Sequence, residues 1–223
     1  MTKKLFFEAM AKFLAGAGMV GLLLFLPAGT LSYAQGWLLM GILLIPMFCA
    51  GIFMMVKNPA LLRSRLDSRE KQTGQQLVIK LSGLLFLLGF ASAGLCYRYD
   101  VGRFPSWVSI PGTVIFLASY GLYGEVLREN TWLSRTVEVQ ENQTVVDTGL
   151  YGLVRHPMYT VTIFLFLSIP LVLGSWISLL FFLPYPAVIV LRIRGEEALL
   201  EKELAGYRDY EKKVRWHLIP GIW

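Results

Sequence analysis

An arginine and a histidine stand directly before a proline in the stretch GLYGLVRHPMYT, residues 149–160. Residues 158–191 then carry no charged side chain, so Arg155 and His156 mark a change from polar to apolar sequence. Proline suits the first position of a helix, whose unpaired N–H groups favour an anionic group. The charged pair at this edge has two possible explanations. Either Arg155 anchors the helix to lipid headgroups and His156 caps it, or the two residues line a binding site.

A second charged group follows the apolar stretch, in RIRGEE. Arg192 and Glu196 are four residues apart and therefore share one face of a helix, while Glu197 points about 100° away. The arginine is suited to a carboxylate or phosphate, and the carboxylate to a cation. The alternative is a solvated helix face, where such a pair contributes only a few tenths of a kcal/mol.

The residues that bind metals are scarce. The chain has two histidines, His156 and His217, and two cysteines, Cys49 and Cys96. The cysteines have no CxxC spacing and lie in apolar stretches, so we expect them to be small core residues. We expect no metal site.

The composition is that of a membrane protein. Hydrophobic residues make up 55% of the 223 residues, and charged residues only 16%, against about 25% in soluble domains. The net charge of +6 is explained by membrane topology and anionic headgroups, so we expect no nucleic-acid partner.

Residues 13–56 contain no charge and would form a helix of about 66 Å, roughly twice the hydrocarbon core. They must cross twice, and the breakers within 27–36 predict the turn. A cleaved signal peptide is the alternative for the first stretch, but no convincing cleavage site follows it. Residues 77–97 and 107–127 predict two further spans.

The last apolar stretch, 157–191, is interrupted by Gly174 and Ser175 and predicts a short helical hairpin. The expected fold is therefore all-α and polytopic, with about five or six membrane helices and a cytoplasmic C-terminal helix. We divide it into a four-helix membrane part, 1–127, and a C-terminal catalytic part, 128–223. With an even number of crossings both termini share one side. Of the 21 Lys and Arg residues, only Arg98 and Arg103 fall on the opposite side, so the termini are predicted to be cytoplasmic.

Four polar or mixed segments complete the chain. Residues 57–76 read as a solvated basic loop. Residues 128–154 mix valines with acidic residues, and we expect them to pack on the body. Residues 187–204 predict a helix that leaves the membrane after a kink at Pro184 and Pro186. The aromatic tail, 207–223, is expected to fold back.

Three blocks together, GLYGLVRHPMY, RIRGEE and YRDYEKKVRWHLIPGIW, resemble the isoprenylcysteine carboxyl methyltransferase family, which is related to the phospholipid N-methyltransferases. The resemblance covers about residues 120–223. It implies S-adenosylmethionine as the methyl donor, held in a pocket on the cytoplasmic side. The partners would be a lipophilic or lipidated acceptor and membrane lipids.

The resemblance also implies the site residues. Arg192 would position the acceptor and Glu196 would act beside it in catalysis. The cofactor-binding residues would be Gln143, Thr144, Val145, Val146, Tyr151, Arg155, His156, Pro157, Met158, Tyr159, Glu196 and Glu197. Tyr151 and Tyr159 offer aromatic faces to adenine or to the sulfonium cation.

Methyl transfer from a sulfonium to an ionised carboxylate needs neither a metal nor a base, only positioning. A prenylated cysteine would supply such a carboxylate. A phospholipid amine would instead need deprotonation, by Glu197 or Tyr159. Two further alternatives remain: an NADPH-dependent reductase of the sterol type, and a membrane scaffold or sensor without turnover.

Overall fold

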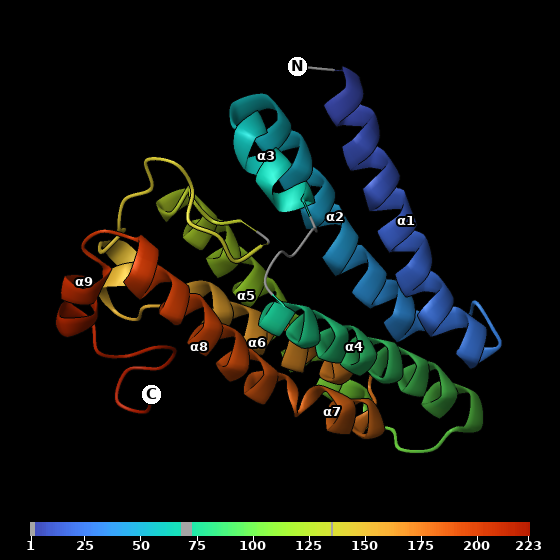
Figure 1. The fold of residues 1–223 in the computed structure, drawn as a ribbon. Helices are drawn as coiled ribbons and strands as arrows, with labels where there is room; N and C mark the ends of the chain where they lie inside the picture. Colours follow the sequence, from blue (N-terminus) through green and yellow to red (C-terminus); the bar gives the residue numbers. More distant parts are fainter. Residues whose placement is uncertain (1–2, 68–72, 135) are drawn as a thin grey trace.

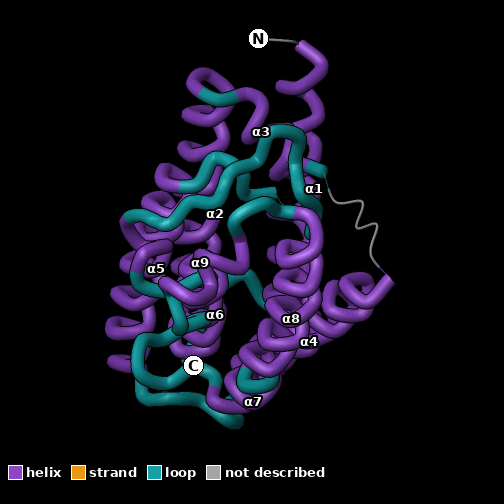
Figure 2. Tube along the Cα trace, turned by 60° about the vertical axis from the view of Figure 1, so that its left-hand side comes forward, coloured by secondary structure: helices purple, strands orange, loops and turns teal. Residues whose placement is uncertain are grey.

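The computed structural model describes residues 3–67, 73–134 and 136–223, and within these ranges the named elements are all helical (Figures 1 and 2). In this part of the chain five helical stretches are long and apolar enough to cross a membrane. They are α1 (Lys3–Ala28), α2 (Ala34–Lys57), α4 (Thr73–Tyr99), α5 (Ser109–Glu129) and the stretch 176–203, which holds two helices. A shorter apolar helix, α6 (Pro157–Val172), joins them. The prediction of an all-α polytopic fold with five or six membrane helices is confirmed.

The remaining elements are short or follow the last break. They are α3 (Pro59–Leu66), η1 (Ser106–Val108), η2 (Gly149–Gly152), α7 (Trp176–Phe182), α8 (Tyr185–Glu203) and α9 (Tyr207–Lys213). The predicted interruption of the hairpin lies between α6 and α7, where Gly174 has a φ of +71°. The expected kink at the prolines is a break between α7 and α8, and Pro184 precedes the first turn of α8.

Three turns meet at one end of the bundle. The Tyr33 hydroxyl, after α1, donates to the Leu173 carbonyl at 2.7 Å. The Phe104 N–H, between α4 and α5, donates to the Gly174 carbonyl at 2.9 Å. These bonds place the α1–α2, α4–α5 and α6–α7 connections together, so successive long helices run in opposite directions.

The core lies between helices from both halves of the chain. Leu24, Leu39, Phe116, Ile169 and Phe182 are fully buried and come from α1, α2, α5, α6 and α7. Helix α5 packs along α6, and α4 packs along α1, α7 and α8. The start of α4 therefore lies against α8, as the ribbon also shows (Figure 1).

One segment differs from its prediction. Residues 57–76 were expected to be a solvated loop, but they contain α3. The Asn58 side chain caps this helix by accepting from the Leu61 N–H at 3.1 Å, and Pro59 opens it. Leu61 and Leu62 are buried, because this apolar pair covers neighbouring helices. Residues 68–72 of the predicted loop lie outside the described residues.

Candidate active site

The aromatic tail lies across the start of α6. The Arg155 and His156 N–H groups donate to the carbonyls of Trp216 and His217 at 2.8 and 2.9 Å. The Thr160 hydroxyl donates to the Leu218 carbonyl at 2.7 Å. The tail thus folds back on the body, and it holds the RHP turn by backbone hydrogen bonds.

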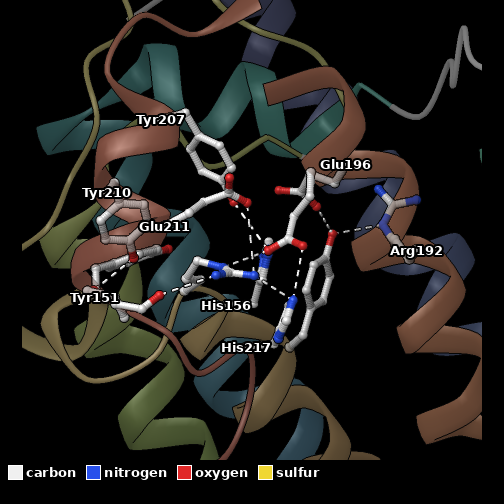
Figure 3. Close-up of polar contacts among 12 residues, drawn as sticks. Tyr151, His156, Arg192, Glu196, Tyr207, Tyr210, Glu211 and His217 are labelled. Carbon is white, nitrogen blue, oxygen red and sulfur yellow. Dashed lines mark hydrogen bonds and ion pairs between the residues drawn. The ribbon is translucent and has the colours of Figure 1, made fainter. Parts of the chain in front are cut away.

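Side chains strengthen this contact through a buried carboxylate (Figure 3). Glu197 is 9% exposed. Its Oε1 accepts from Arg155 Nε at 2.8 Å and from His156 Nε2 at 2.9 Å, and the Tyr207 hydroxyl lies at 3.4 Å. We call Arg155, His156, Glu197, Tyr207 and His217 the Glu197 cluster. It joins the start of α6, the middle of α8, α9 and the tail.

His217 is neutral in this arrangement. Its Nε2 lies 2.5 Å from Arg155 NH2, and a guanidinium can only donate, so this ring nitrogen accepts and carries no proton. Burial lowers the pKa of His217 below its usual value; Arg155 adds to this lowering, while the Glu197 carboxylate opposes it. The contact of 3.1 Å between His217 Nε2 and Glu197 Oε2 is then not a hydrogen bond.

A second network lies beside the first and contains both predicted catalytic residues (Figure 3). The Tyr159 hydroxyl donates to Glu196 Oε2 and accepts from Arg192 Nε at 3.0 Å. Arg192 and Glu196 thus use one face of α8, as their spacing predicts. A residue of α4 completes the network, because Gln75 Oε1 accepts from Arg192 NH1 at 3.3 Å.

The second network opens into a pocket. The space within its walls is about 820 Å³, part of which is open to solvent. Its walls come from the segment 130–146, η2, the start of α6, α8 and α9. The lining residues are Asn130, Trp132, Leu133, Ser134, Thr136, Val137, Glu138, Gln143, Thr144, Val145, Val146, Tyr151, Arg155, His156, Met158, Tyr159, Arg192, Glu196, Leu199, Leu200, Leu204, Tyr207 and Tyr210.

Most of the residues singled out in the sequence line this one pocket, and two do not. Pro157 is buried as the first residue of α6, and Glu197 turns into its cluster. Both act on the pocket indirectly, because they fix the helix start and the turn that carry His156 and Tyr159.

Other lining residues were not among the predicted site residues, although Tyr207 and Tyr210 belong to the third sequence block. Asn130 and Trp132 follow α5, and Tyr207 and Tyr210 belong to α9. The available signal was the mixed composition of residues 128–154, which predicted packing on the body. Within that segment Arg135 lies outside the described residues.

Glycine allows the turn before α6 to close. Gly149 has a φ of +56°, and a Cβ there would lie 1.9 Å from Glu129 Oε1. The other oxygen of this carboxylate accepts from the Leu150 N–H at 2.8 Å. The GLYG turn is thereby tied to the end of α5, and Tyr151 is held in the pocket wall.

The C-terminal half of the chain is similar to a known family. Residues 110–205 match the phospholipid methyltransferase family. The match spans α5 to α8 and so includes most of the pocket, but it leaves out Gln75 and the tail. No curated protein matches the chain.

The fold is similar to that of a solved structure, the eukaryotic intramembrane Ras methyltransferase known as isoprenylcysteine carboxyl methyltransferase. The two share 17% sequence identity with a TM-score of 0.58, over 96% of this chain and 77% of that one. The resemblance predicted from the three sequence blocks is confirmed. The chain thus shares its fold with a membrane methyltransferase, and residues 110–205 match a family of methyltransferases.

Proposed function

We propose that this protein transfers a methyl group from S-adenosylmethionine to the carboxylate of a lipophilic acceptor, such as a prenylated cysteine, at the membrane surface. One observation carries the proposal. A single pocket brings together Arg192 and Glu196 from α8, the RHPMY helix start and the segment 143–146, although these lie in separate parts of the sequence.

The pocket suits a nucleoside-bearing cofactor. The Tyr151 hydroxyl is buried in its wall and finds no hydrogen-bond partner among the described residues. Burial raises the pKa of Tyr151, and the neighbouring Asn130 amide offsets this only in part. A buried hydroxyl in this state favours a ligand that supplies the missing bond.

When bound, S-adenosylmethionine supplies an electrophilic methyl group on a sulfonium, and displacement leaves a neutral thioether. The chain's own residues provide orientation. Arg192 presents planar N–H donors that match a carboxylate. Glu196 places negative charge in the same wall, where it complements a cation. Tyr159 bridges the two, so the acceptor and donor subsites adjoin.

Apolar side chains form a further part of the wall and limit the access of water. They include Val145, Val146, Leu199, Leu200 and Leu204. Holding a nucleophile and a methyl carbon in line can lower a barrier by about 7–11 kcal/mol. An ionised carboxylate needs no base at neutral pH. Positioning is therefore the main task of this site.

An amine acceptor is the second candidate, because the matching family model is that of phospholipid methyltransferases. An amine must lose a proton, and Glu197 and Tyr159 were the bases considered from the sequence. Glu197 is engaged by Arg155 and His156 and does not line the pocket. The Tyr159 hydroxyl already donates to Glu196, so it would act as a relay that takes the amine proton while it gives up its own. Its partner Glu196 would receive the proton.

The test is a tritiated-methyl assay on membranes that contain the full chain, followed by mass identification of the labelled lipid. We expect label on a base-labile methyl ester. Label on a headgroup amine would establish the second candidate. Calorimetry in detergent with S-adenosylhomocysteine and with NADPH adds a direct comparison. Binding of NADPH alone would overturn the proposal in favour of a reductase, and binding without any transfer would indicate a sensor.

A further inference from the structure

A buried glutamine at the start of α4 contacts the acceptor side of the pocket. Gln75 is 3% exposed and lies 117 positions before Arg192 in the sequence. It is outside the stretch that matches the family model, and no motif marks it. Its contacts are nevertheless directed at one residue.

The Gln75 amide binds Arg192 at two points. Its Oε1 accepts from the guanidinium NH1 at 3.3 Å, and its Nε2 donates to the Arg192 main-chain carbonyl at 3.2 Å. One rigid amide therefore ties the side chain to its own backbone. A guanidinium fixed in this way loses less rotational freedom when it binds a carboxylate.

Gly195 provides the space for this arrangement. A Cβ at position 195 would lie 2.2 Å from Gln75 Nε2 and 3.4 Å from its Cδ. Glycine in the middle of a helix is otherwise unfavourable. The clash would fall on the far end of a flexible side chain, so alanine at 195 displaces the amide without preventing α8 from forming.

We propose that Gln75 is a positioning residue for the acceptor: it fixes the Arg192 guanidinium, Gly195 makes its approach possible, and α4 is thereby part of the active site. This inference rests on the proposed role of Arg192 and extends it to the N-terminal half of the chain.

The first measurement does not depend on activity. Arginine modification by phenylglyoxal is followed by mass spectrometry on the full chain in detergent, with exposed Arg194 as the internal reference. In the Gln75→Ala variant we expect Arg192 to be modified several-fold faster, while the rate at Arg194 stays unchanged. An Arg192 rate equal to that of the wild type would overturn the proposal.

The second measurement separates positioning from stability. In Gln75→Ala the KM for the labelled acceptor should rise about tenfold, as expected for losing a hydrogen bond to a charged group. The affinity for S-adenosylhomocysteine and the Tm should stay near the wild-type values. Gln35→Ala, the same truncation at the other end of the bundle, is the matched control. A loss of cofactor affinity equal to the loss for the acceptor would contradict a positioning role.

A double-mutant cycle tests the part of Gly195. Gly195→Ala alone should reproduce the effect of Gln75→Ala, because it displaces the same amide. Added to Gln75→Ala it should cause no further loss, since the clashing atoms are gone. If the two substitutions acted independently, so that their effects on KM multiplied in the double variant, the proposal would be overturned. If the wild type labels no acceptor at all, the proposed function fails, and the modification rates still decide whether Gln75 fixes Arg192.

Discussion

Two arginines at the pocket have different surroundings, and their roles follow from these. The Arg155 side chain is 8% exposed and pairs with Glu197 at 2.8 Å and Glu211 at 4.0 Å. Such a paired cation stabilises the fold. Arg192 lies in the pocket wall, where its contacts include the Tyr159 hydroxyl and the Gln75 amide, and under the proposed function it positions the acceptor.

We expect Arg192→Ala to lower the rate of methyl transfer by roughly 100-fold or more, equivalent to about 2.7 kcal/mol, because the acceptor carboxylate loses its bidentate partner. Affinity for S-adenosylhomocysteine should stay within a few fold, whereas Glu196→Ala should weaken it. Steady-state rates and calorimetry check both. Exposed Arg194→Ala is the control and should behave as wild type. Full activity of Arg192→Ala on the true acceptor would refute its role.

His217 should make the fold sensitive to mild acid. Its folded-state pKa lies below the usual 6.5, chiefly because of burial. As the pH falls below about 6.5, His217 takes up a proton in the unfolded chain before it does so in the folded one. The free energy of unfolding therefore decreases as the pH falls, until the pH has passed the folded-state pKa. Thermal unfolding between pH 7.5 and 5 should show this slope in the wild type and a smaller slope in His217→Gln. Equal slopes would exclude His217 as the cause.

Glu211 acts in the opposite sense and at lower pH. Burial raises the pKa of its carboxyl above 4.5. Between the unfolded-state pKa and this raised value the folded state binds more protons than the unfolded state, and it gains stability as the pH falls. The comparison between wild type and His217→Gln removes this contribution, because Glu211 is present in both.

Single residues could be predicted where a local rule applied. Helical periodicity placed Arg192 and Glu196 on one face, and both reach the Tyr159 hydroxyl. Gln75 could not be predicted, since its role depends on α4 lying against α8. No spacing rule connects residues 117 positions apart, and a glutamine in an apolar helix carries no signal of its own.

At the scale of elements, the Glu197 cluster decides how α8, α9 and the tail meet the start of α6. Removing one partner of a buried ion pair typically costs about 3–5 kcal/mol. Glu197→Gln should therefore lower the Tm by several degrees and expose the tail to trypsin at Lys213 or Arg215. Exposed Glu203→Gln should change neither. An unchanged Tm and digestion pattern would show that backbone hydrogen bonds alone hold the tail.

Hydropathy predicted the long helices, because burial in lipid requires long apolar runs whatever their tertiary contacts. Hydropathy missed α3. Two of its eight residues are arginines, so the mean hydropathy of the segment is that of a polar stretch. The signal was present in a different form: Asn58 and Pro59 form a helix start, and the adjacent leucines form a buried face.

At the scale of the whole molecule, the pocket lies at the end of the bundle opposite the three joined turns. That end of the bundle also contains the starts of α4 and α6 and the ends of α5 and α8. Arg98, in the last turn of α4, and Arg103 lie beside the joined turns, while the other basic residues in the described part of the chain lie toward the pocket end or at its edge. The division at residue 127 stays a prediction, and the shared core shows that both parts pack together.

The charge distribution predicts that the pocket end faces the cytoplasm. Single cysteines in a Cys49→Ala, Cys96→Ala background test this with a membrane-impermeant maleimide on sealed vesicles of known orientation. Asp209→Cys, on α9, should react only from the cytoplasmic side, and Ser106→Cys, beside the joined turns, only from the opposite side. Three crossings separate these two positions if the hairpin of α6 and the run 176–203 spans the membrane, and one crossing if it does not, so both cases place them on opposite sides. Labelling of both sites from the same side would mean an even number of crossings between them and would contradict the predicted topology.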